Sequence, residues 1–202
     1  MHAVQDVVDT IAEATRLGTD AALRAGGALM SPQVHVLVEH VEEPYFGYLS
    51  CRPFYRGGDV VDAMGVMGVI GSLLGASRLL VVWEHQDLCT ALELPGAESE
   101  PYGQVVVDAE RDGGHVLRWR PFRLHIGQPT SVGLPSVVPE WGDPALHPDV
   151  KLPTPVEALL AVWREPRAWT SAERADALAY LEESGYRMRW VSRFGGERAA
   201  IG

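Results

Sequence analysis

The segment Gly57–Asp87 constrains the fold more than any other part of the chain. Its first half, Val60–Leu74, is apolar and carries glycines three and four residues apart, which predicts a helix with one small-residue side. The continuous apolar run Leu79–Trp83 then predicts a buried strand that ends at polar residues. Because an interior glycine costs a helix about 1 kcal/mol relative to alanine, the glycines indicate close packing against a sheet or another helix.

Segments on both sides of this helix alternate between apolar and polar residues or are rich in β-branched and aromatic residues, as strands are. Besides the strand at Leu79–Trp83, the strands predicted in this part of the chain are residues 33–39, 45–51, 89–94, 105–110 and 115–124. The Asp112-Gly113 turn gives the clearest hairpin signal. We therefore predict an α+β fold: a two-layer sandwich with a mostly antiparallel sheet of five to seven strands. A helix over residues 3–25 and the glycine-rich central helix pack on this sheet.

The chain divides into three predicted parts. Residues 1–126 form an α+β core domain, and residues 127–155, with seven of the 14 prolines, form a proline-rich surface linker. Residues 156–202 form a small α-α-β tail that packs on the core or extends it, with a capping box at Thr170 and Glu173 and a strand over 186–193.

Composition restricts the partners. The 47% hydrophobic share is typical of a packed protein, and the net charge of −10 argues against non-specific binding to nucleic acid or anionic membranes. No signal peptide or membrane span is predicted, so we expect an acidic cytoplasmic protein. Arginine makes up all basic residues except Lys151, which we attribute to a GC-rich bacterial genome in preference to selection for anion recognition.

A polar rim follows from the predicted topology. If strands 45–51 and 79–84 are parallel neighbours, the central helix crosses between them, and its start lies near the ends of both strands. The hairpin would bring Gln33 and His35 to the same edge. The other residues expected at this edge are Arg52, Arg56, Asp59, Asp62, Glu84, His85 and Asp87.

This rim has a functional and a structural interpretation. The candidate catalytic residues are Asp59, Glu84, His85 and Asp87, and the candidate metal ligands are Asp59, Glu84 and His35. Arg52 and Arg56 could bind an anion. In the structural interpretation, which we favour, the aspartates cap the helix, residues 84–87 form a solvated turn and the arginines pair with the acids.

No familiar catalytic motif supports the functional interpretation. The chain has no phosphate-binding glycine loop, no nucleophile elbow, no HExxH motif and no CxxC pair, and the sequence identifies no cofactor. Cys51 and Cys89 are expected to be buried free thiols, although a cysteine–histidine nucleophile pair is left open.

Arginines alternate with aromatic residues in two predicted strands. Arg118 and Arg120 flank Trp119, and Arg187 and Arg189 precede Trp190. Such a pattern can bind anions or nucleic acid, but it also describes the outer face of a strand whose arginines pair with carboxylates, which we favour in an acidic chain.

These observations favour a non-catalytic protein-interaction protein of the adaptor, chaperone or immunity type, which binds a protein partner or self-associates. The alternatives are a metal-dependent phosphoester hydrolase that uses the rim, and an anion- or nucleic-acid-binding protein that uses the arginine strands. No membrane partner is expected, and nucleic acid is disfavoured by the net charge.

Overall fold

The computed structural model describes residues 2–26, 29–39, 41–129, 131, 133 and 136–191. Its helices are α1 His2–Arg24, α2 Gly58–Val66, α3 Gly68–Leu73, α4 His85–Ala91, α5 Thr154–Arg164 and α6 Ser171–Glu183, with a 3-10 turn at Ala97–Ser99. Its strands are β1 Gln33–Leu37, β2 Tyr45–Ser50, β3 Arg78–Glu84, β4 Gly103–Glu110, β5 His115–Ile126, β6 Val137–Trp141, β7 Ala145–Pro148 and β8 Arg187–Trp190.

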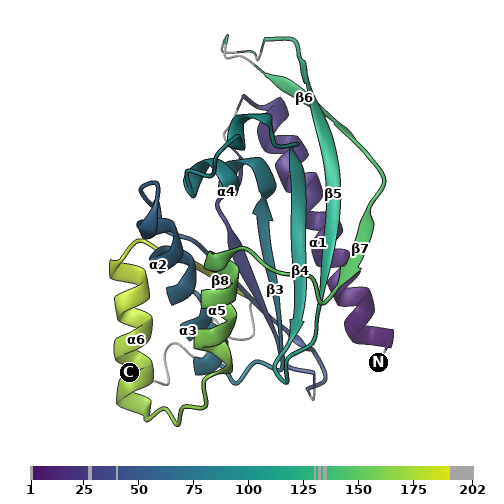
Figure 1. Cartoon of the computed structure of the whole chain (residues 1–202). Helices are drawn as coiled ribbons and strands as arrows, with labels where there is room; N and C mark the ends of the chain where they lie inside the picture. The colour runs from purple at the N-terminus through teal and green to yellow at the C-terminus, as the bar shows by residue number, and fades with distance from the viewer. Residues whose placement is uncertain are drawn as a thin grey trace.

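One antiparallel sheet organises the molecule (Figure 1). The strand order is β6-β5-β4-β3-β1-β2-β8, and β7 pairs with the first half of β5. The predicted α+β class with an antiparallel sheet and packed helices is thus confirmed. Among the described residues the sheet has eight strands, more than the expected five to seven, because the segment predicted to be a proline-rich linker supplies β6 and β7.

The helices are divided between the two faces of the sheet, because successive strand residues point to opposite sides. Val34 and Val36 face the large core formed with α2, α3, α5 and α6. Leu37 and Leu80 face a smaller core formed with α1. Figure 1 shows α1 on one side of the sheet and α2, α3, α5 and α6 on the opposite side, so the sheet is a middle layer.

The glycine-rich segment forms two short helices, α2 and α3, which meet at Met67. Close packing of its glycines is confirmed, and the partner is α5. A methyl group at Gly68 would overlap the carbonyl oxygen of Leu159, and one at Gly71 would lie 2.7 Å from the Trp163 side chain. The absence of side chains at these two positions lets the backbones of α3 and α5 approach each other.

Two local predictions are wrong. Residues Cys89–Leu94 are not a strand, because residues from His85 onward form α4, a short helix capped by Glu84. Strands β2 and β3 are not neighbours, because β1 lies between them and pairs with both. Since β1 is antiparallel to each, β2 and β3 still run in the same direction and end on the same side of the molecule.

The C-terminal part is an α-α-β unit, in which α5 and α6 pack on the large core and β8 extends the sheet beyond β2. The last two residues of the predicted strand 186–193 lie outside the described residues. Within the described ranges, no helix combines the length and the apolarity needed to cross a bilayer.

Candidate functional site

The start of α2 and the region around α4 meet at one end of the sheet. The backbone N–H of Gly57 donates to the carbonyl oxygen of Ala91 at 2.8 Å, and Arg56 lies within electrostatic reach of Asp87. The structure therefore brings Asp59 and residues 84–87 to the same end of the molecule. His35 is separated from them, because it faces α1 while α2 lies on the opposite face of the sheet.

Asp59 is held by the loop that precedes α2. Its carboxylate accepts hydrogen bonds from Arg52 at 2.5 and 3.1 Å and from the backbone N–H of Tyr55 at 2.7 Å. The Arg52 guanidinium, together with the Tyr55 N–H, lowers the pKa of Asp59 to about 2. The expected cap is wrong in detail, because Gly57 occupies the N-cap position and no side chain caps α2. Asp62 is exposed.

Glu84 joins α4 to the start of β4. One carboxylate oxygen accepts a hydrogen bond from the N–H of Asp87 at 2.6 Å, and the other accepts one from the N–H of Gly103 at 2.8 Å. The residue is 7% exposed, and this burial raises the pKa of its carboxyl. Glu84 thus satisfies two main-chain donors, which supports a structural role for it.

Replacing Glu84 with alanine is expected to lower the free energy of unfolding by about 2 kcal/mol, since one helix cap is lost and the buried Gly103 N–H is left without its acceptor. Glutamine at the same position keeps one acceptor oxygen, so Glu84→Gln should lose less. Urea denaturation followed by circular dichroism measures both. An alanine variant as stable as the wild type would show that the carboxylate has no structural role.

His85 and Cys89 are one turn apart on α4. The Nε2 atom of His85 lies 3.2 Å from a carboxylate oxygen of Glu100 and 3.7 Å from the sulfur of Cys89. Burial raises the pKa of the Cys89 thiol, and the nearby Glu100 and Glu84 raise it further. The thiol is therefore protonated near neutral pH, which is the opposite of what an activated nucleophile requires.

The candidate metal ligands do not converge. Asp59 and Glu84 each accept several hydrogen bonds from the protein, and His35 lies across the sheet from α2. Among the residues that the structure describes, no group of three or more His, Cys, Asp or Glu side chains is arranged to hold a metal ion.

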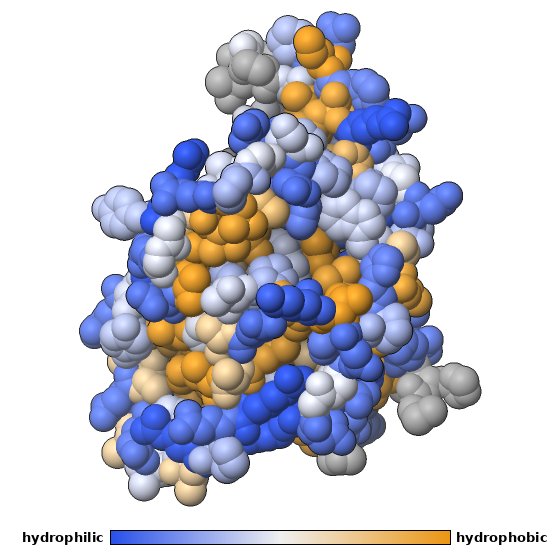
Figure 2. Space-filling model, viewed as in Figure 1, coloured by the Kyte–Doolittle hydropathy of each residue, from blue (hydrophilic) through white to orange (hydrophobic). Residues whose placement is uncertain are grey.

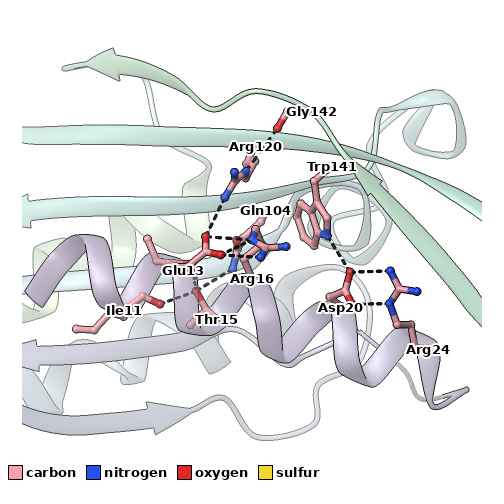
Figure 3. Close-up of polar contacts among 11 residues, drawn as sticks. Ile11, Glu13, Thr15, Arg16, Asp20, Arg24, Gln104, Arg120, Trp141 and Gly142 are labelled. Atoms are coloured by element: carbon pink, nitrogen blue, oxygen red, sulfur yellow. Dashed lines mark hydrogen bonds and ion pairs between the residues drawn. The ribbon is translucent and has the colours of Figure 1, made fainter.

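Two of the predicted anion-binding arginines hold α1 on the sheet. Arg118 lies 2.6 Å from Asp9. Arg120 lies 3.0 Å from Glu13, as Figure 3 shows. The same interface contains hydrogen bonds from Trp141 to Asp20 and from Gln104 to Thr15. These two arginines therefore match the structural interpretation.

The remaining arginine candidates differ in their surroundings. Arg52 is paired with Asp59, and its pKa is raised by that hydrogen bond. Arg56 is exposed beside α2. Arg187 and Arg189 are exposed on β8, which is an edge strand of the sheet. The sequence predicted one set of six anion-binding arginines. The structure divides this set into arginines that pair with carboxylates and arginines that are exposed.

An apolar surface at the same end was not predicted. Tyr55 is 85% exposed and Leu94 is 47% exposed, and both lie where the chain entering α2 meets the end of α4. Val61 of α2 and Leu92 at the end of α4 are half-buried and pack against the large core. We group these four residues as the α2–α4 patch. Figure 2 shows apolar side chains gathered between α2 and α4 and bordered by hydrophilic ones. Sequence periodicity gave no signal, because three of the four residues lie outside regular elements.

Comparison of the chain with protein-family models, with curated proteins and with solved structures finds no match.

Proposed function

We propose that this protein is a non-catalytic interaction protein that binds a protein surface, either a second copy or a separate partner, through the α2–α4 patch. The observation that carries the proposal is the exposure of Tyr55 and Leu94 at one junction of the fold. Apolar patches bordered by polar residues are typical of protein interaction sites, and tyrosine is a favoured anchor in them.

The contacts of the rim residues favour binding over catalysis. Asp59 and Glu84 are engaged in hydrogen bonds that hold loops and helices together. The thiol of Cys89 has a raised pKa. A hydrolase would need at least one of these groups positioned to act on a substrate, whereas an interaction protein needs them only to hold the patch in shape.

The test compares two double variants of the full chain. Tyr55→Glu with Leu94→Glu places charges in the patch, and Tyr180→Glu with Leu146→Glu makes the same changes at exposed sites elsewhere. Light scattering over a range of concentrations measures self-association, and affinity capture from the source cells measures partner binding. The patch variant is expected to lose at least about tenfold in affinity, while the control variant keeps wild-type binding.

Two results would contradict the proposal. The wild-type protein could remain monomeric at every concentration and capture no partner. Alternatively, the patch variant and the control variant could bind equally well, which would place the interface elsewhere on the molecule.

A further inference from the structure

A cavity lies between α1 and the strands β1 and β2, on the face of the sheet opposite the α2–α4 patch. Its volume is about 520 Å³, which is within the range of small-molecule sites. Ile11 and Ala14 of α1 line one wall, and Tyr45 and Tyr48 of β2 line the other. The cavity exists because α1 packs most closely on β4 and β6 and leaves the β1–β2 side less covered.

Several polar groups of the lining are already engaged within the protein. The Thr10 hydroxyl donates to the carbonyl oxygen of Asp6 at 2.7 Å, and the Thr15 hydroxyl donates to the α1 backbone at 2.9 Å. Nδ1 of His35 lies 3.0 Å from the Tyr45 hydroxyl. No Asp, Glu, Lys or Arg lines the cavity within the described part of the chain. The cavity therefore favours the uncharged, apolar part of a ligand.

The flank of α1 that borders the cavity is elongated and uncharged. Val7, Thr10 and Ala14 line the cavity, and Leu17 continues the same stripe at helical spacing and is 54% exposed. The stripe from Val7 to Leu17 extends roughly 15 Å along the helix axis. A long, narrow apolar surface of this kind fits a hydrocarbon chain better than a compact molecule.

An unpaired arginine lies beside the tyrosine wall. Tyr48 is directly opposite Arg189 of β8, and residues that are directly opposite each other in a sheet point to the same face. Arg189 is therefore next to Tyr48 on the face that carries the cavity, and it is exposed. Arg118 and Arg120 pair with acids of α1, whereas Arg189 has no carboxylate within ion-pair distance among the described residues. Its guanidinium is free to bind an anion.

We propose that the cavity binds a medium-chain fatty acid, with its hydrocarbon chain between α1 and the β2 tyrosines and its carboxylate paired with Arg189. The guanidinium can donate two parallel hydrogen bonds to a carboxylate, which fixes the orientation of the chain. A singly charged carboxylate is favoured over a phosphate, because the net charge of −10 repels a more highly charged anion more strongly.

Isothermal titration calorimetry with decanoate and decan-1-ol tests the site, because the two ligands have similar alkyl chains and only decanoate is charged near neutral pH. The wild type is expected to bind decanoate at one saturable site, about tenfold more tightly than the alcohol. Arg189→Gln should lower the affinity for decanoate to that for decan-1-ol and leave the affinity for the alcohol unchanged. Arg123→Gln removes an exposed arginine from β5, toward the opposite edge of the sheet, and should change neither affinity.

The apolar part of the site has a separate readout. Ala14→Trp would fill the cavity from an exposed position on α1 and should abolish the binding of both ligands. Ala179→Trp adds the same side chain to an exposed position of α6, on the opposite face of the sheet, and should leave both affinities unchanged.

Four results would overturn the proposal. They are the absence of saturable decanoate binding to the wild type, equal affinities of the wild type for the two ligands, unchanged decanoate binding in Arg189→Gln or Ala14→Trp, and binding to phosphatidylglycerol vesicles without binding to decanoate. None of these substitutions lies in the α2–α4 patch, so failure of this proposal can be told from failure of the proposed protein interaction.

Discussion

Replacing Gly68 with alanine is expected to lower the free energy of unfolding by about 3 kcal/mol, the largest loss that we predict for a single added methyl group. The new Cβ would overlap the carbonyl oxygen of Leu159 and would lie 3.0 Å from the backbone nitrogen of Trp163. Both obstacles are main-chain atoms of α5, so a side-chain rotation cannot relieve them. Urea denaturation followed by tryptophan fluorescence measures the loss.

Gly58→Ala provides the matched control, since it makes the same change at the start of α2, where no atom lies within 4 Å of the added Cβ. Gly58→Ala should raise the free energy of unfolding by less than about 1 kcal/mol, because alanine is the better helix former. If the two substitutions change the free energy of unfolding equally, Gly68 is not required for the close approach of α3 and α5.

Acidification from pH 7.5 to pH 5 is expected to remove about 2 kcal/mol of stability through His35 alone. Burial lowers the pKa of His35 from 6.5 to about 4, so the unfolded chain takes up a proton at a higher pH than the folded one. The stabilisation is complete above pH 6.5 and is lost progressively as the pH falls from 6.5 toward 4. The measurement is the free energy of unfolding of the wild type and of His35→Phe at both pH values.

His35→Phe should lose less stability than the wild type over this interval, whatever its stability at pH 7.5. Asp59 does not interfere, because its pKa is lowered from 3.8 to about 2 and its own contribution is lost at lower pH. Parallel losses in the two proteins would show that His35 takes up its proton equally in the folded and unfolded states.

Elements with strong local signals could be predicted from the sequence. The Asp112-Gly113 turn gives the β4–β5 hairpin, and the capping box of Thr170 and Glu173 begins α6. The glycines at 68 and 71 indicated a close backbone contact, although only the structure identifies α5 as the partner. In each case the residues that carry the signal are neighbours in the chain.

Features that depend on non-local pairing could not be predicted. The insertion of β1 between β2 and β3 is a choice among several hydrogen-bonded arrangements that the same strand patterns allow. The pairing of Arg118 and Arg120 with α1 joins residues more than a hundred positions apart. α4 was missed because seven residues give too short a pattern to separate a helix from a strand.

In the candidate site, too, some features could be predicted from the sequence and others could not. The gathering of residues 59 and 84–87 was predicted correctly from an incorrect strand order, since two strands that run the same way end together whether or not a third lies between them. The engagement of Asp59 and Glu84 depends on donors at Tyr55 and Gly103, whose positions the sequence does not give.

Amide hydrogen exchange on the assembled protein tests the central claim most directly, because it locates the binding surface without assuming it. If the α2–α4 patch forms the interface, exchange in residues 55–61 and 88–94 will slow on assembly while exchange in β8 stays unchanged. Slowed exchange confined to β8, where Arg187 and Arg189 are exposed, would contradict the account and assign binding to the arginine edge.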